Sequence, residues 1–553
     1  MTNNQMSPEE RCRALFASCG VPVTSKVGSY EEFMLRDEEG VGLRTQIWLP
    51  EEPSPAPCIV VRSCYAGQEA MMIVRAEEYC RRGFGFVLQW CRGTNGSEGV
   101  WEPNVNERRD GLRLMQFLQE DDRFGALGYW GDSYLALTGW AMADAVPDKV
   151  KTMFLGVYGC DRHTSAYKDG LFRQDILTSW AMQNAGHPVN ADYMTSAAYR
   201  PQINVDEAMW GGELAWYRSW ISSPDRSDPY WKQGFWNQLY NIPGKVKFPV
   251  FIREGWYDHH LGSALATFDL LSEEAKKHSV LQIGPWNHGY QPVIAHQDIT
   301  LLEDDSVRTP IQWFDRILRR NELPEGEVQL YQIGEDRWLN APWPLPETKT
   351  CTYYLSGTSL SAEPAHGETV RTYTYDPENP VLSHGAESLL KSWDEIGSLK
   401  QPEPGWRKDV LTWMSDPLKN DLQVCGPIEV HLCVSSDAED TSFTAKLMEV
   451  FEDGTAVNMR GTITTLAYRN NADSRLTYTP GEKTEITLRM WPLAWTLKKG
   501  SRLRLDVSSS DFPQYAVHSN YPGVWSTQEH TKKAEESVYA SPAAPSRIIL
   551  PLL

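Results

Sequence analysis

Strand-like and helix-like segments alternate along the first third of this 553-residue chain. Short apolar runs at 45–49, 58–62 and 84–89 are separated by, or followed by, patterns typical of helices at 70–82 and 106–119. Parallel strands need long crossover connections, which helices usually provide. The alternation therefore predicts an α/β, doubly wound fold, with a mainly parallel sheet covered by helices on both faces.

The tetrapeptide Gly-Asp-Ser-Tyr at 131–134 lies between an apolar run at 126–130 and a helical pattern at 135–146. A serine between a strand and a helix, two residues after a glycine, is the local pattern of a nucleophile elbow. Glycine suits the tight turn, and the next N–H can face a developing oxyanion. The pattern favours a nucleophilic Ser133. A serine that merely caps a helix is an alternative interpretation of the same tetrapeptide. The common motif also has a second glycine two residues after the serine, where this chain has Leu135.

A catalytic serine needs a base, and the base needs a carboxylate that orients it. In doubly wound hydrolases the order along the chain is serine, acid, histidine, each after a strand. Asp258 follows the expected strand at 250–254, and His288 follows the one at 279–283. Considered alone, Asp258 is better interpreted as a helix cap and His288 as a loop histidine. Together they predict a Ser133–His288–Asp258 triad.

Two further histidines, His259 and His260, follow the acid directly. Either offers an alternative base, or a metal ligand beside Asp258. A base next in sequence to its own carboxylate is hard to orient, and no further ligands cluster nearby. We therefore predict neither role. The sequence has no phosphate-binding loop, and we expect no metal and no cofactor.

The character of the chain changes three times. Helical, Trp-rich segments replace strands at 161–245, and a period-two pattern with one apolar face dominates after 348. We predict a core in two parts, 1–160 and 246–347, with a helical cap at 161–245 between them. Residues 348–553 are predicted to form a two-sheet β-sandwich.

The composition narrows the function classes. The formal net charge of −20 disfavours nucleic acid and anionic membranes as partners. No apolar run is long enough for a membrane span, and the N-terminus lacks a secretory pattern, so we expect a cytoplasmic protein. The ten cysteines form no C-x-x-C pair and are expected to be reduced thiols.

Seven segments of the chain resemble the CocE/NonD family of α/β-hydrolases, the group of cocaine esterase and X-prolyl dipeptidyl peptidase. They are Arg-Ser-Cys-Tyr at 62–65, Arg-Gly-Thr-Asn-Gly-Ser-Glu-Gly at 92–99, Gly-Asp-Ser-Tyr-Leu-Ala at 131–136, Gly-Trp-Tyr-Asp at 255–258, Gly-Pro-Trp-Asn-His-Gly at 284–289, Trp-Met-Ser-Asp-Pro-Leu at 413–418 and Gly-Pro-Ile-Glu-Val at 426–430. The resemblance covers nearly the whole chain. It implies an α/β-hydrolase core, a helical cap and a C-terminal jelly roll.

The resemblance also implies roles at matching positions. Ser133 would be the nucleophile, His288 the base and Asp258 its orienting acid. Tyr65 would donate its hydroxyl to the oxyanion, beside the backbone N–H of Tyr134. From the residues alone, Tyr65 is a core aromatic at a strand end.

Three positions depart from the family pattern without removing a catalytic group. Ala136 replaces a usual glycine, Arg-Ser-Cys-Tyr replaces the usual Arg-Thr-Pro-Tyr, and Trp90 replaces a common aspartate. The loop after Trp90 lies near the nucleophile in the family, so pocket shape is expected to differ there. We expect the substrate pocket to be lined by Trp90, Phe172, Trp180 and Trp256.

The predicted cap is rich in aromatic and acidic residues. Its aromatics are Phe172, Trp180, Trp210, Trp216 and Trp220, and its acids include Asp161, Asp169, Asp175 and Glu213. The aromatics indicate either a bulky apolar substrate group or the packing of a small helical domain. The acids would bind a substrate amine, or form a solvated helix surface, which we favour.

The function predicted is a serine hydrolase that cleaves a small-molecule ester or amide through an acyl-enzyme. Acyl transfer to another acceptor and an X-Pro-type dipeptidyl peptidase use the same triad. In another class, a binding protein would hold carbohydrate or a partner with its β-sandwich, although a fold alone assigns no function. A homodimer would be ordinary for such an enzyme.

Overall fold

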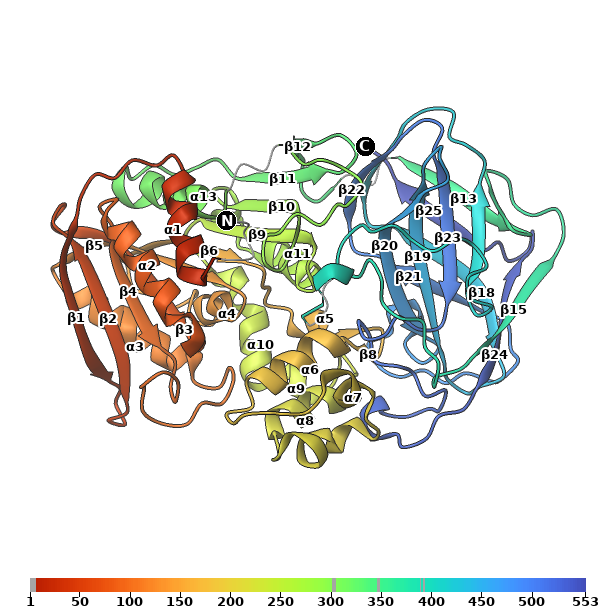
Figure 1. Cartoon of the computed structure of the whole chain (residues 1–553), viewed down its shortest axis with the longest axis horizontal. Coiled ribbons are helices and arrows are strands. Elements are labelled where there is room, and N and C mark those ends of the chain that lie inside the picture. Colours follow the sequence, from red (N-terminus) through yellow and green to blue (C-terminus); the bar gives the residue numbers. More distant parts are fainter. Residues whose placement is uncertain (1–5, 301–304, 346–348, 388, 391–392) are drawn as a thin grey trace.

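The computed structural model of the chain describes residues 6–300, 305–345, 349–387, 389–390 and 393–553. Three regions lie side by side in Figure 1. The α/β core is red, orange and green, a group of helices is yellow, and a β-rich region is cyan to blue. Within the described ranges, no helix has the length and apolar character needed to cross a bilayer.

The core is built on a ten-stranded sheet in the order β1-β2-β4-β3-β5-β6-β9-β10-β11-β12. Its strands are β1 (Val27–Arg36), β2 (Gly42–Pro50), β3 (Ala56–Ser63), β4 (Gly85–Trp90), β5 (Phe124–Asp132), β6 (Val150–Gly156), β9 (Val250–Tyr257), β10 (Val280–Asn287), β11 (Glu327–Gln332) and β12 (Arg337–Asn340). From β4 to β11 all neighbours pair parallel, and β1, β2 and β12 pair antiparallel. The mainly parallel sheet expected from the alternation is present.

Helices cover both faces of this sheet because side chains alternate along each strand. Val60 of β3 packs in one apolar cluster and its neighbour Val61 in another. The first cluster includes residues of α3 (Glu107–Glu120) and α11 (Leu261–Leu270), and the second includes residues of α1 (Pro8–Ser18), α2 (Glu69–Cys80) and α13 (Asp305–Phe314). The winding is therefore double, as expected.

The helix that follows Ser133 is shorter than expected. A helix was predicted over 135–146, but α4 spans Tyr134–Trp140. Beyond it, the N–H groups of Met142 and Ala143 bond to carbonyls three residues back, at 3.2 Å each. Such bonds tighten the chain into turns.

Residues 161–245, which we call the helical segment, lie between β6 and β9. Its helices are α5 (Arg162–Ala166), α6 (Gln174–Gln183), α7 (Tyr193–Ala198), α8 (Ala215–Ser222), α9 (Pro229–Lys232) and α10 (Gly234–Asn241). It also holds a small hairpin of β7 (Tyr167–Lys168) and β8 (Leu171–Phe172), which the sequence pattern did not reveal. Phe172 stacks on Trp525 with ring centroids 5.5 Å apart, so the hairpin contacts the β-rich region.

The β-rich region contains an 11-stranded sheet, ordered β15-β24-β18-β25-β13-β14-β16-β23-β19-β20 with β21 on β18, and a β17–β22 pair. The strands are β13 (Thr350–Ser356), β14 (Ser359–Ser361), β15 (Thr369–Tyr375), β16 (Leu411–Ser415), β17 (Leu422–Gly426), β18 (Glu429–Ser436), β19 (Ser442–Val450), β20 (Ala456–Thr465), β21 (Thr484–Arg489), β22 (Leu493–Leu497), β23 (Arg502–Ser508), β24 (Ala534–Ala540) and β25 (Arg547–Pro551). In β18, Val430, Leu432 and Val434 are fully buried, as period-two patterning predicts. The jelly-roll topology stays a prediction.

Candidate active site

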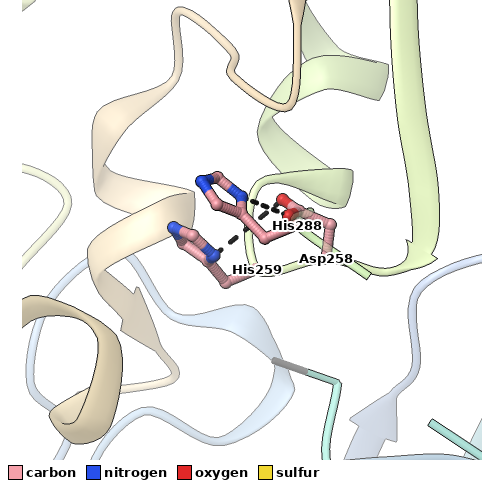
Figure 2. A group of neighbouring side chains, drawn as sticks. All are labelled: Asp258, His259 and His288. Atoms are coloured by element: carbon pink, nitrogen blue, oxygen red, sulfur yellow. Dashed lines mark hydrogen bonds and ion pairs between the residues drawn. The ribbon is translucent and has the colours of Figure 1, made fainter. Parts of the chain in front are cut away.

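Ser133, His288 and Asp258 form one hydrogen-bonded line. Nε2 of His288 lies 3.0 Å from Oγ of Ser133, and its Nδ1 lies 2.5 Å from Oδ2 of Asp258. The three residues stand just after, or at the end of, β5, β10 and β9. These strands run parallel in the sheet, so their carboxyl ends meet at one edge. Figure 2 shows the His288 ring facing the Asp258 carboxylate.

The turn at Ser133 is sharp. Ser133 has φ 56° and ψ −125°, which L-residues other than glycine rarely adopt. A Cβ at Gly131 would lie 2.2 Å from the carbonyl oxygen of Leu135. Glycine is therefore sterically required two residues before the serine. The strained turn lifts the Ser133 hydroxyl out of the sheet toward His288.

The ion pair sets the protonation of Asp258 and His288. Burial disfavours charge on both groups, but each favours the charge of the other. The pKa of Asp258 is lowered and that of His288 is raised. Asp258 also accepts a bond of 2.7 Å from the N–H of His260. The ionised carboxylate holds the proton of neutral His288 on Nδ1 and leaves Nε2 to accept one from Ser133.

Two donors flank the nucleophile. Tyr65, just after β3, accepts a 3.1 Å bond from Nε1 of Trp180, so its own proton remains to be donated elsewhere. Burial raises the pKa of Tyr65, against smaller opposing effects of Trp180 and Ser133, and keeps the hydroxyl neutral. The N–H of Tyr134 begins α4 and has no acceptor within the helix.

The hydroxyl of Tyr134 is held by a buried hydrogen-bond network. Its hydroxyl donates to Oε1 of Glu107 and accepts from the N–H of Asn104, both at 2.8 Å. Glu107 in turn pairs with Arg62 at 2.8 Å. This buried network fixes the start of α4, and with it the Tyr134 N–H.

His259 lies against the triad. Side-chain ligand atoms of Asp258, His259 and His288 fall within 4.8 Å of one another (Figure 2). Both nitrogens of His288 are already engaged, and Nδ1 of His259 is 3.9 Å from the Asp258 carboxylate. Burial lowers the pKa of His259 and of His260 well below the usual value, so both are neutral. Hydrogen bonds of the triad account for this cluster, and His288 stays the predicted base.

A cavity next to Ser133 is lined by residues from three regions of the chain. The residues that line it include Tyr65, Ser133 and His288 of the core, Arg162, Trp180 and Trp220 of the helical segment, and Leu389, Leu390 and Trp393 of the C-terminal region. Trp180 stacks on Tyr134 with ring centroids 5.9 Å apart, which joins the helical segment to the elbow.

Trp180 is the one of four predicted pocket residues that lines this cavity; among the described residues, Trp90, Phe172 and Trp256 lie elsewhere. Trp90 ends β4 with its side chain on the opposite face of the sheet, where Nε1 donates to Gln46. Trp256 is buried in the core with Nε1 bonded to the Tyr331 carbonyl, and Phe172 packs on Trp525. The predicted pocket is corrected at these three positions.

None of the four acids named from the helical segment lines the cavity. Each has a partner: Asp161 pairs with Arg226 at 2.9 Å, Asp169 with Lys168 at 3.1 Å, Glu213 with Arg218 at 3.5 Å, and Asp175 accepts from the hydroxyl of Tyr193. Asp161 and Asp175 are buried, so the expected solvated surface is wrong for these two.

Tyr158 and Arg162 line the cavity and were not singled out from the sequence. Both come shortly after β6, the neighbour of the nucleophile strand. Side chains that follow parallel strands gather at the same sheet edge, so their position in the chain was a usable signal.

Comparisons with known proteins show which family the chain resembles. Residues 39–290 match the family model "X-Pro dipeptidyl-peptidase (S15 family)", and residues 321–549 match "X-Pro dipeptidyl-peptidase C-terminal non-catalytic domain". A cocaine esterase from Rhodococcus sp. (strain MB1 Bresler) is 27% identical over 94% of this chain and 98% of its own length. The chain belongs to the CocE/NonD, X-Pro dipeptidyl-peptidase-like family. It is a serine hydrolase.

Solved structures show the same fold at lower identity. An aminopeptidase from a marine sediment archaeon, Thaumarchaeota archaeon, is 20% identical, with a TM-score of 0.81 over 96% of this chain and 97% of that one. An α-amino acid ester hydrolase is 21% identical, with a TM-score of 0.80 over 96% and 98%. The α/β-hydrolase core with a C-terminal domain is thus common to this family member and both neighbours.

Proposed function

We propose that this serine hydrolase cleaves an ester or amide of a small molecule through an acyl-enzyme on Ser133. The observation that carries the proposal is the unbroken line from Ser133 through His288 to Asp258, with contacts of 3.0 and 2.5 Å. Ser133 and His288 line a cavity whose lining also includes Tyr65 and Tyr134, the two proposed oxyanion donors.

The reaction follows from these positions. Nε2 of His288 takes the hydroxyl proton as Ser133 Oγ attacks the substrate carbonyl, and Asp258 stabilises the imidazolium that forms. The Tyr65 hydroxyl and the Tyr134 N–H hold the oxyanion. His288 then protonates the leaving alcohol or amine. Water, activated by the same histidine, releases the acid and restores Ser133.

The competing functions have less support. An X-Pro-type dipeptidyl peptidase must bind a free ammonium, yet Asp161, Asp169, Asp175 and Glu213 all have other partners and none lines the cavity. No observation singles out an acceptor other than water. A purely binding role would leave the complete triad without a purpose.

Labelling with a fluorophosphonate probe tests the proposal. The folded protein should react at Ser133, and the Ser133→Ala variant should not react. Ser227→Ala, which changes an exposed serine of the helical segment, is the matched control and should label fully. Wild-type protein that is folded, fails to label and leaves aryl esters intact would contradict the proposal.

A further inference from the structure

Arg162 brings a buried positive charge to the cavity without a counter-ion. It is 8% exposed and lines the cavity as the first residue of α5. Its guanidinium carbon lies 4.7 Å from the ring centroid of Trp220 and 5.6 Å from that of Trp236. Among the described residues its Nε has no hydrogen-bond partner and no carboxylate pairs with it. The neighbouring Asp161 is taken by Arg226.

Most buried arginines among the described residues pair closely with a carboxylate, unlike Arg162. Arg62, Arg82, Arg92, Arg173 and Arg504 each hold a carboxylate oxygen at 2.5–3.0 Å. Arg75 has two unpaired nitrogens, but it packs on Trp130 in the core and does not line the cavity. A buried charge without a partner is costly, so an uncompensated arginine in a binding cavity calls for an anionic ligand.

A second unpaired donor faces the same space. The buried hydroxyl of Tyr158 lies beside the Arg162 side chain, and among the described residues no group accepts its proton; Tyr158 also lines the cavity. Burial raises the pKa of Tyr158, and the nearby Arg162 charge opposes that rise, so the phenol is a neutral donor beside the guanidinium. The Tyr158 ring packs on neutral His260 at 4.5 Å.

The one permanently charged side chain in the described lining of the cavity favours an anion. Within the described part of the chain, Arg162 is the one lining residue with a permanent charge, and no aspartate or glutamate lines the cavity. Much of the rest of the lining is apolar or aromatic, including Leu177, Trp180 and Trp220, and Trp220 packs on Arg162 itself. Such walls lower the local dielectric and strengthen a charge-assisted hydrogen bond.

We propose that Arg162 and Tyr158 bind a carboxylate of the substrate, so that this hydrolase prefers esters or amides that carry an anionic group. The planar guanidinium suits a carboxylate, which it can hold through two parallel N–H bonds. The cleavage part of this inference rests on the proposed function, whereas binding of the carboxylate does not.

Matched substrates test the preference and show where the carboxylate lies. In one pair, 4-nitrophenyl hydrogen glutarate carries it in the acyl group and 4-nitrophenyl pentanoate is the neutral match. In the other, 3-acetoxybenzoate carries it on the leaving group and 3-acetoxybenzamide is the match. Wild-type kcat/KM should favour the carboxylate member of at least one pair by about 10- to 100-fold.

Variants assign that preference to Arg162. Arg162→Gln should abolish it by lowering kcat/KM for the carboxylate member about 10- to 100-fold more than for the neutral member, and Arg162→Lys should retain part of it. Lys232→Gln removes an exposed charge of the helical segment and should leave the preference unchanged. Equal losses for both members of a pair, or no preference in wild type, would overturn the inference.

A binding measurement separates this inference from the proposed function. The Ser133→Ala protein is titrated with 3-phenylpropanoate and 3-phenylpropanamide, followed by the fluorescence of the cavity tryptophans. The carboxylate should bind at least about tenfold more tightly, and Arg162→Gln in the same background should remove the difference. If wild type labels at Ser133 but the two ligands bind equally, the inference fails and the proposed function stands. If labelling at Ser133 fails and the carboxylate still binds more tightly than the amide, the proposed function fails and the binding of a carboxylate by Arg162 and Tyr158 stands.

Discussion

The core edge and the helical segment face the same cavity, but they hold their polar groups in opposite ways. At the core edge, Ser133, His288 and Asp258 satisfy one another in a closed line. On the other side, Arg162 and the adjoining Tyr158 have polar atoms without partners. The proposed catalytic groups are therefore paired with one another without a ligand, whereas the proposed recognition groups keep polar atoms that a ligand would pair.

Removal of the nucleophile gives the largest expected effect on the core side. Ser133→Ala should lower kcat for an aryl ester by about 10⁴- to 10⁶-fold, because the residual rate comes from the oxyanion donors and binding alone. Stopped assays over hours measure the residual rate, and circular dichroism confirms the fold. A loss of less than about tenfold would mean that another residue is the nucleophile.

Loss of the orienting acid should follow closely. Asp258→Asn should lower kcat/KM by about 10⁴-fold, because an amide neither stabilises the imidazolium nor fixes its tautomer. The dependence of kcat/KM on pH gives a second test of this pair. Neutral His288 is the active form, and the ion pair raises its pKa above 6.5, so wild-type kcat/KM should fall as pH drops through a value above 6.5.

In the Asp258→Asn protein that acid limb should move to lower pH, because burial then acts on His288 without the opposing carboxylate. Asp315→Asn, which changes a surface carboxylate paired with Arg320, is the control and should leave the limb in place. A limb that does not move would show that His288 is not the group that titrates.

The oxyanion donor ranks third. Tyr65→Phe should lower kcat by about 10²- to 10³-fold with little change in KM, because its hydroxyl bonds most strongly to the charge that develops in the transition state. Steady-state kinetics on an aryl ester measure the two constants separately. A change confined to KM would assign Tyr65 to substrate binding.

Loss of the hydrogen bond between Trp180 of the helical segment and Tyr65 of the core should have the smallest effect on kcat. Trp180→Phe removes the 3.1 Å bond to the Tyr65 hydroxyl and keeps an aromatic ring against Tyr134. We expect kcat to fall about fivefold, the worth of one neutral hydrogen bond. A loss as large as that of Tyr65→Phe would show that the helical segment sets the oxyanion donor rather than assisting it.

The same contrast explains what the sequence could predict. Ser133, Asp258 and His288 each follow a strand whose apolar run is visible locally, so their meeting at one edge follows from the topology. Trp90 shows the limit: whether a residue at the end of β4 faces the cavity or the other face depends on strand phase, and here it faces α2.

The sequence does not predict which distant segments come into contact. Phe172 is buried by Trp525, more than three hundred residues later, and Leu389 and Leu390 reach the cavity from the C-terminal region. Periodicity describes one element at a time, so it gives the apolar character of such residues but not their neighbours. Of the corrected pocket residues, Phe172 is of this kind.

Trapping of the acyl-enzyme tests directly whether Ser133 is the nucleophile. The protein is mixed with a slowly deacylated aryl ester, quenched in acid within the burst, and its peptides are mapped by mass spectrometry. We expect one acyl group per chain, on the peptide that contains Ser133, formed at the rate of the burst. An acyl group on another residue, or steady hydrolysis with Ser133 unmodified throughout and no burst under conditions that slow deacylation, would contradict it.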